Sequence, residues 1–256
     1  MPAETAPSER KVLLTGATGG IGRAIVEALA ARGCAVGACD VPGAPLAELT
    51  RATTTVEFDV RDRAAAQTGV DDAIAALGGC DAVVANAGIV DTIHRAERFS
   101  DEEWRKDIET NLYGAFYVVR AAFEALAQSG DGRVVLISSA AAEIGIPGQV
   151  AYGASKAGLV GMARTLAGEW APRGIRCNVV MPGFIATPKV LAMPERVQGS
   201  IAAAIPLGRF GAAEELAGVV SFLLSPAAAY VNGAVLRVDG GLGLSVGAPI
   251  GGAVTS

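Results

Sequence analysis

The sequence predicts a doubly wound α/β domain, in which a parallel sheet of about seven strands carries helices on both faces. Short runs rich in β-branched residues alternate with longer Ala-rich segments of helical periodicity. The strand runs are apolar throughout, as expected for strands that helices cover on both sides. No change of composition and no Ser/Pro-rich linker divides the 256 residues. One domain over 11–242 is therefore predicted, with a flexible N-terminus at 1–10 and a C-terminal arm at 243–256.

The predicted strands are short and lie between segments of turn or helical character. In chain order they are KVLLT (11–15), AVGACD (35–40), VEFDV (56–60), DAVVANAG (81–88), GRVVLISS (132–139), IRCNVVMPG (175–183) and GAVLRVDGG (233–241).

The predicted helices fill the intervals between these strands. The first follows the first strand and ends at Gly33, and the second lies near 62–77. A long helical stretch is predicted from about Asp101 to Ala127, with Ser100 as N-cap and Glu103 as its capping-box partner. A helix around "AYGASKAGL" follows, and two more are expected between the last two strands.

Composition and charge exclude several classes of function. The net charge is −5 and no run of Lys and Arg occurs, which argues against a nucleic-acid partner. No apolar run reaches ~18 residues without a charge, so no membrane span is expected. The polar segment "MPAETAPSER" lacks the apolar region of a secretory signal. We therefore expect a cytoplasmic protein.

Cysteine and histidine usage argues against a metal centre. The four cysteines, Cys34, Cys39, Cys80 and Cys177, form no CxxC pair and have apolar neighbours, so buried free thiols are expected. The only histidine is His94. A multi-histidine metal site or a catalytic triad would rest on that single residue, and we expect no metal.

A glycine-rich turn, "TGATGGIG" from Thr15 to Gly22, joins the first strand to the first helix. Glycines at positions 16, 20 and 22 allow a tight turn and a close approach of the backbone to a pyrophosphate at the helix N-terminus. Glycine triplets also occur in ordinary turns. The position after the first strand of an α/β chain nevertheless favours a dinucleotide site.

The second strand ends in Asp40, 18 residues beyond Gly22. A carboxylate there accepts hydrogen bonds from the adenosine ribose hydroxyls and repels a 2′-phosphate. No basic residue lies between Gly16 and Gly20. Both features predict NAD rather than NADP, although Asp40 as the mere cap of a turn beside "VPGAP" stays open.

Tyr152 and Lys156 are four residues apart, so both side chains lie on one face if the segment is helical. Two interpretations compete. The pair is either an ordinary polar pair on a helix surface, or a lysine that lowers the pKa of the phenol for proton transfer.

The chain resembles the short-chain dehydrogenase/reductase superfamily, in its single-domain branch with a Rossmann-type fold. The resemblance covers residues from about 10 to 242. It rests on TGATGGIG, Asn86-Ala87-Gly88, Asn111 in "ETNLYGAF", Ser139 in "LISSAA", Tyr152 with Lys156, and Pro182-Gly183, which occur in the order and at the spacing of the family.

The resemblance assigns catalytic roles to four residues. Tyr152 would be the general acid in ketone reduction and the general base in alcohol oxidation, with a phenol pKa lowered from about 10 by a nearby cation together with the positive nicotinamide of the oxidised cofactor. Lys156 would supply that cation and also bind the nicotinamide ribose. Ser139, favoured by spacing over Ser138, would hydrogen-bond the substrate oxygen. Asn111 would hold a water that links Lys156 to solvent.

The resemblance also implies contacts to the cofactor and the substrate. Asp59 and Val60 would contact the adenine, and Thr187 the carboxamide. The full set of expected cofactor contacts is Gly16, Thr18, Gly19, Gly20, Ile21, Gly22, Asp40, Asp59, Val60, Asn86, Ala87, Gly88, Tyr152, Lys156, Pro182, Gly183, Ile185 and Thr187. The expected substrate pocket is Ser139, Ala141, Glu143, Ile144, Gln149, Phe184 and Met193, with Ile89, His94, Val190 and Leu191 nearby.

These residues predict an NAD(H)-dependent enzyme acting on CH–OH groups, which interconverts a secondary alcohol and a ketone on a mostly hydrophobic small molecule. One alternative is a 3-oxoacyl-[acyl-carrier-protein] reductase. Such enzymes usually use NADPH and carry a basic residue in the glycine-rich turn, which is absent here. A second alternative is a non-catalytic dinucleotide sensor. The resemblance of the last helix and strand implies a homotetramer.

Overall fold

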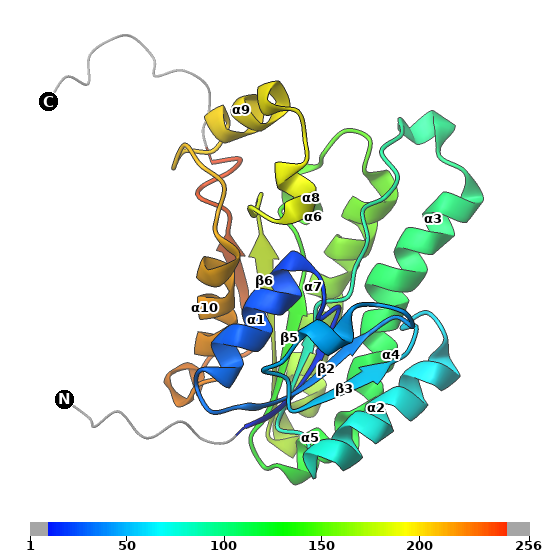
Figure 1. The fold of residues 1–256 in the computed structure, drawn as a ribbon, viewed down its shortest axis with the longest axis vertical. Helices are drawn as coiled ribbons and strands as arrows, with labels where there is room; N and C mark the ends of the chain where they lie inside the picture. The colour runs from blue at the N-terminus through cyan, green and yellow to red at the C-terminus, as the bar shows by residue number, and fades with distance from the viewer. Residues whose placement is uncertain (1–9, 245–256) are drawn as a thin grey trace, which may run out of the picture.

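The structure is a computed structural model that describes residues 10–244. Seven strands form one sheet in the order β3-β2-β1-β4-β5-β6-β7, and every neighbouring pair is parallel (Figure 1). The strands are β1 (Lys11–Thr15), β2 (Ala35–Asp40), β3 (Thr54–Glu57), β4 (Ala82–Ala85), β5 (Gly132–Ile137), β6 (Ile175–Pro182) and β7 (Val235–Val238). The predicted fold class is confirmed. Most of the expected N-terminus at 1–10 and C-terminal arm at 243–256 lies outside the described residues.

Helices connect the strands. The α-helices are α1 (Gly20–Ala30), α2 (Arg63–Leu77), α3 (Asp101–Ile108), α4 (Gly114–Ala121), α5 (Phe123–Gln128), α6 (Ala141–Ile144), α7 (Val150–Trp170), α8 (Pro188–Leu191), α9 (Glu195–Ala203) and α10 (Ala213–Leu223). A π-helix, η3, spans Glu109–Tyr113, and single 3₁₀ turns are η1 (Leu46–Glu48), η2 (Ala96–Arg98), η4 (Ala171–Arg173) and η5 (Pro226–Ala228). Within residues 10–244, no helix is long and apolar enough to cross a membrane.

Two hydrophobic cores lie on the two faces of the sheet. Consecutive strand residues point to opposite faces, so Leu13 of β1 belongs to the core beneath α2, α4 and α7, and Leu14 to the core beneath α1 and α10. Both leucines are fully buried. Burying a leucine side chain stabilises the fold by about 1.5–3 kcal/mol. This explains why the strands had to be apolar on both faces.

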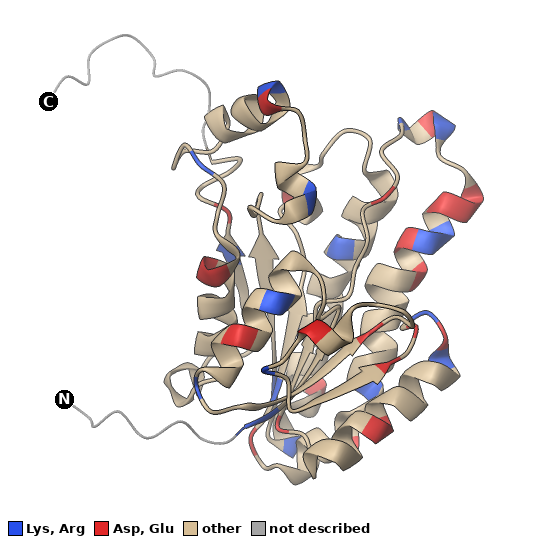
Figure 2. Cartoon of the chain, in the orientation of Figure 1, with Lys and Arg blue, Asp and Glu red and all other residues tan. Residues whose placement is uncertain are grey.

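Side-chain caps begin helices α2 and α3, and the second of these was predicted. Asp62 caps α2, because its carboxylate accepts hydrogen bonds from the backbone N–H groups of Ala64 and Ala65. The capping box between Ser100 and Glu103 is present at α3. Helix α3 carries acidic residues in its first turn and basic residues in its last (Figure 2), which suits the helix dipole.

The long helix predicted from Asp101 to Ala127 is wrong in one respect, since three α-helices and a π-helix occupy this stretch. The π-helix contains Asn111, whose side chain is hydrogen-bonded to the backbone of Ile89 and to Ser155 on α7. These tertiary bonds draw the chain out of α-helical register. Such π segments are frequent at functional sites.

The segment between β6 and β7 contains three helices rather than the two predicted. The additional one is the short helix α8. Thr187 caps it by accepting a hydrogen bond from the backbone N–H of Val190, and Pro188 occupies its first turn. A single helical turn has too little periodicity to be recognised in a sequence.

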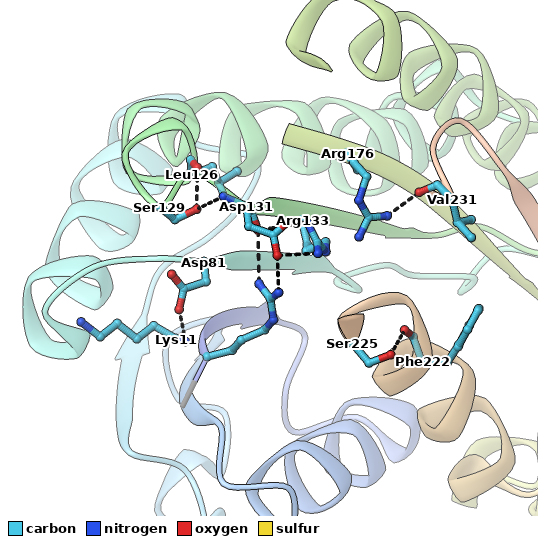
Figure 3. Close-up of polar contacts among 11 residues, drawn as sticks. Lys11, Asp81, Leu126, Ser129, Asp131, Arg133, Arg176, Phe222, Ser225 and Val231 are labelled. Atoms are coloured by element: carbon cyan, nitrogen blue, oxygen red, sulfur yellow. Dashed lines mark hydrogen bonds and ion pairs between the residues drawn. The ribbon is translucent and has the colours of Figure 1, made fainter. Parts of the chain in front are cut away.

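The amino ends of the strands are held together by charged side chains (Figure 3). Asp131 accepts hydrogen bonds from Arg10 and from Arg133, and Arg176 donates to the carbonyl oxygen of Val231. Burial lowers the pKa of Arg133 to about 9. These polar contacts join different strands at their amino ends.

Candidate active site

A cavity of about 990 Å³ lies at the carboxyl edge of the sheet. The ends of β1, β2, β4, β5 and β6 line it, together with residues of α7 and α8. The strand order reverses between β1 and β4. Ligands of open α/β sheets bind outside the carboxyl ends of the strands at such a reversal. Every residue that was expected to contact the cofactor lines this cavity.

The glycine-rich turn requires its glycines for three different reasons. Gly16 has φ +64°, a conformation that L side chains rarely adopt. A Cβ atom on Gly22 would lie 2.1 Å from the carbonyl oxygen of Gly16, so any side chain would break the turn. A Cβ on Gly20 would lie 2.9 Å from Cβ of Thr187, because the start of α8 folds over the turn.

Asp40 stands at the end of β2 with its carboxylate fixed beside this turn. The backbone N–H and the hydroxyl of Thr18 both donate to Oδ2 of Asp40, at 2.9 and 2.6 Å. The backbone N–H of Val41 donates to Oδ1 at 2.8 Å. The carboxylate lies in the cavity wall and also caps the backbone of Thr18 and Val41, so the interpretation as a turn cap stands beside that of a ribose ligand.

Asp59 and Val60 lie in the same wall of the cavity, and the next residue, Arg61, was not predicted to be there. Arg61 also lines the cavity and pairs with Asp59, with Nη2 and Oδ2 2.6 Å apart. The hydrogen bonds from Arg61 hold the pKa of Asp59 below its usual value. The charge of Arg61 is thereby largely balanced.

Tyr152 and Lys156 lie one turn apart on α7 and both face the cavity. The Lys156 ammonium is 5.8 Å from the centre of the Tyr152 ring and donates a 2.9 Å hydrogen bond to the carbonyl oxygen of Ile137. Lys156 is buried. The interpretation of an ordinary polar pair on a helix surface is therefore wrong.

Burial dominates the electrostatics of this pair. It raises the pKa of Tyr152, although a hydrogen bond with the Ser139 side chain acts in the opposite direction. Burial also lowers the pKa of Lys156 to about 8. The expected lowering of the Tyr152 pKa is thus not a property of the chain by itself, since removing the phenolate from water outweighs the stabilising contacts.

The two candidate serines make different contacts. Ser138 is buried and donates a 2.8 Å hydrogen bond to the backbone carbonyl of Lys156. Ser139 accepts a hydrogen bond from the backbone N–H of Ala141, lines the cavity with Tyr152, and acts to lower the pKa of that phenol. This geometry supports Ser139 as the residue beside the reacting oxygen, with Ser138 holding the helix in place.

Asn111 is fully buried behind the cavity wall. Its Oδ1 accepts a 2.7 Å hydrogen bond from the backbone N–H of Ile89, and its Nδ2 donates to the carbonyl oxygen of Ile89 and to Ser155. A Cβ on Gly88 would lie 2.9 Å from Nζ of Lys156 and 3.1 Å from Oδ1 of Asn111. The lack of a side chain at Gly88 therefore keeps the space between the ammonium and the amide open.

The substrate side differs in part from the prediction. The expected residues that line the cavity are Ser139, Gln149, Phe184 and Met193, with Ile89 and Val190. Ala141 does not line it because it is buried at the start of α6, and Glu143 turns toward Arg237, 3.3 Å away. Ile144 is exposed outside the cavity. After Ala140, the next residue of this segment that lines the cavity is Ile146.

His94 and Leu191 also lie outside the lining. His94 instead approaches Glu103, with Nδ1 3.3 Å from Oε1. The apolar residues that the prediction missed include Val41, Phe58, Val90, Ile93, Ile137, Ala140, Ile146 and Leu242. They confirm that the walls are mainly apolar.

A charged bridge at the edge of the cavity was not predicted at all. Asp91 pairs with Lys106 on α3 and with Lys189 on α8, at 3.3 and 2.9 Å. The two lysines line the cavity and hold the pKa of Asp91 below its usual value. The three residues are far apart in the sequence, so no local pattern predicts that they form ion pairs.

A doubly wound parallel sheet with a glycine-rich turn at its order reversal defines a dinucleotide-binding α/β protein. The family model described as enoyl-(acyl carrier protein) reductase matches residues 16–243. The chain belongs to the short-chain dehydrogenase/reductase family, a family of oxidoreductases that bind a nicotinamide dinucleotide, and the resemblance seen in the sequence is confirmed.

Relatives cover nearly the whole chain. The (3R)-3-hydroxyacyl-CoA dehydrogenase of Mus musculus is 40% identical over 245 residues, which covers 90% of this chain and 95% of that protein. The 3-oxoacyl-[acyl-carrier-protein] reductase of Escherichia coli strain K12 is 41% identical over 234 residues, with 90% and 96% covered. The solved structure of levodione reductase matches with a TM-score of 0.87 and 33% identity, covering 91% of this chain and 97% of that one.

Proposed function

We propose that the protein is an NAD(H)-dependent oxidoreductase that interconverts a secondary alcohol and a ketone on a mostly hydrophobic small molecule. The observation that carries the proposal is one cavity that holds Ser139, Tyr152 and Lys156 among apolar walls and also holds Asp40 beside the glycine-rich turn. The residues present fit the cofactor, because the turn leaves room for a pyrophosphate and Asp40 presents a carboxylate to a ribose.

Bound NAD⁺ supplies the hydride acceptor for alcohol oxidation. Ser139 and Tyr152 receive the hydroxyl of the substrate, and Oη of Tyr152 takes its proton as the general base. Lys156 stabilises the phenolate form by its positive charge and, by family resemblance, binds the nicotinamide ribose. In ketone reduction the same phenol returns the proton to the developing alkoxide, and Ser139 donates a hydrogen bond to it.

Because burial raises the pKa of Tyr152, a positive charge in addition to Lys156 is needed to bring the phenol toward neutrality. The ring of an oxidised nicotinamide carries such a charge. Loss of the Tyr152 proton, which yields the phenolate base, is therefore coupled to binding of the oxidised cofactor in this proposal. Asn111 and Gly88 border the space beside the Lys156 ammonium through which the proton would reach solvent.

Asp40 is expected to make NADH bind at least tenfold more tightly than NADPH, about 1.4 kcal/mol. The fixed carboxylate repels a 2′-phosphate and accepts hydrogen bonds from the ribose hydroxyls. Fluorescence titration with each dinucleotide measures the ratio. Asp40→Asn should reduce the preference, and Asp72→Asn, at an exposed position of α2, should leave it unchanged. Equal affinities of the unmodified protein for NADH and NADPH would refute this role of Asp40.

A second candidate is the reduction of a 3-oxoacyl thioester. It is supported by the relatives named for 3-hydroxyacyl-CoA and 3-oxoacyl-[acyl-carrier-protein] substrates, and the apolar cavity walls suit an acyl chain. A substrate panel that contains both cyclic secondary alcohols and 3-oxoacyl thioesters separates the two candidates by kcat/KM. The residues in the catalytic roles are the same in both.

A further inference from the structure

Asp107, at the end of α3, is a buried carboxyl group that the mechanism above does not use. Its side chain is 1% exposed. In the described part of the chain, Oδ2 has no hydrogen-bond partner and the carboxyl group takes part in no ion pair. An isolated buried carboxylate is costly, so such groups are retained mainly where they have a function.

Asp107 lies on a helix that packs against α7, the helix that carries Tyr152 and Lys156. Asp107 lies about one turn before Asn111, and helix α3 packs against α7. Asn111 itself reaches α7 by its hydrogen bond to Ser155, which in turn donates to the carbonyl oxygen of Tyr152. Asn111 Oδ1 and Lys156 Nζ lie 3.1 and 2.9 Å from the same point, the position of a Cβ on Gly88, so Asp107 is one helical turn away from a residue that borders the ammonium.

Among residues 10–244, Lys156 forms no ion pair with any carboxylate. Its ammonium donates to the carbonyl oxygen of Ile137, and no carboxylate among residues 10–244 lies within ion-pair distance of it. The charge of Asp107 favours the ammonium form of Lys156 against the effect of burial. The same charge also raises the pKa of Tyr152, but less than burial does, and its effect is smaller than the opposite effect of Ser139.

The other charges around Asp107 come from three elements. Asp91 and Glu103 act against its ionisation, and Lys106 and Lys189 favour it. Desolvation exceeds all four, so burial raises the pKa of Asp107 to about 6. The carboxyl group is thus ionised at neutral pH and protonated in mild acid.

We propose that Asp107 is a positioning residue whose carboxylate keeps the buried Lys156 in its ammonium form. The inference rests on the proposed function, since it concerns the residue that would bind the nicotinamide ribose and support the phenolate. In this proposal a carboxylate on α3, that of Asp107, keeps the proton on Lys156 of α7. Lys156 would then remain a cation at a higher pH than its burial alone permits.

The test is the pH dependence of NADH affinity, measured by fluorescence titration without any substrate. Affinity should fall on the alkaline side as Lys156 loses its proton. In Asp107→Asn, the midpoint of this fall should move to lower pH by at least ~0.5 unit, because the supporting charge is gone. Asp107→Glu should keep the midpoint near that of the unmodified protein. Asp101→Asn, at an exposed position of the same helix, is the matched control.

Thermal unfolding separates this role from a structural one. The folded-state pKa of Asp107 lies above its ordinary value of 3.8, so its ionisation opposes folding as the pH rises from about 4 to about 6. Asp107→Asn should therefore have an equal or higher melting temperature above pH 6, and the difference should vanish below about pH 4.

Three results would overturn the inference. An unchanged midpoint in Asp107→Asn would show that the carboxylate does not act on Lys156, and would leave the proposed function intact. Loss of folding in both the Asn and the Glu variants would assign Asp107 a structural role. A chain that binds no nicotinamide dinucleotide at any pH would overturn the inference and the proposed function together.

Discussion

Tyr152→Phe is expected to lower kcat/KM for alcohol oxidation and for ketone reduction by roughly a thousandfold, and to leave NADH affinity nearly unchanged. General acid–base catalysis by a positioned side chain contributes about 10²–10⁴ in rate, and this variant removes only the hydroxyl that would carry the proton. The ring that faces the Lys156 ammonium is retained. Steady-state kinetics and NADH titration of the same preparation measure the two effects.

The matched control is Tyr113→Phe, because Tyr113 is 49% exposed and lies outside the cavity lining. It should keep full activity. Unchanged turnover in Tyr152→Phe would show that the proton-transfer assignment is wrong. NADH binding by the unmodified protein without turnover of any ketone in the panel would favour the dinucleotide sensor instead.

Lys156→Met is expected to reduce both NADH affinity, by at least tenfold, and the rate of turnover, by roughly a hundredfold or more. One residue serves both steps, since its ammonium would bind the ribose and stabilise the phenolate. The methionine fills a similar volume, and Lys156 is buried without a carboxylate in ion-pair distance among the described residues. The substitution removes a buried charge but also the donor to the carbonyl oxygen of Ile137, so the melting temperature should change only slightly.

Lys106→Met provides the comparison, because Lys106 also lines the cavity but is partly exposed and pairs with Asp91 at its edge. It should change turnover far less than Lys156→Met. If Lys156→Met lost neither affinity nor rate, the assignment of Lys156 to both roles would fail. A melting temperature well below that of the unmodified protein would instead mean that the loss of activity reports unfolding.

The features that the sequence predicted are those with a local signature. The inner strands were recognisable because they are short apolar runs that are mostly buried, whereas the strands at the two ends of the sheet, β3 and β7, are only partly buried or exposed. The glycine-rich turn and the Tyr152–Lys156 pair are recognised by a spacing of a few residues, and the structure brings both to one cavity.

The features that the sequence did not predict depend on contacts between distant segments. The π-helix at Glu109–Tyr113 follows from hydrogen bonds of Asn111 to Ile89 and Ser155. The bridge of Asp91 to two lysines joins three elements. Glu143 was expected in the pocket, but its pairing with Arg237 from β7 turns it away. Neither periodicity nor spacing carries this information.

The direction of the pKa shift of Tyr152 is a further difference with a physical cause. Lys156 and the oxidised nicotinamide together were expected to lower this pKa, and in the chain alone, without the cofactor, burial raises it. Desolvation depends on how completely the surrounding elements close around a group. A sequence does not specify this degree of closure.

The most direct test of the account is to follow the transferred hydride. A hydrophobic ketone is incubated with the protein and with NADH that carries deuterium at the transferable position, and the product is analysed by mass spectrometry and NMR. We predict an alcohol with one deuterium on the carbinol carbon, and almost none of it when Tyr152→Phe is used. Alcohol without deuterium, or no alcohol from any ketone despite tight binding of NADH, would contradict the assignment of the protein as an NAD(H)-dependent oxidoreductase.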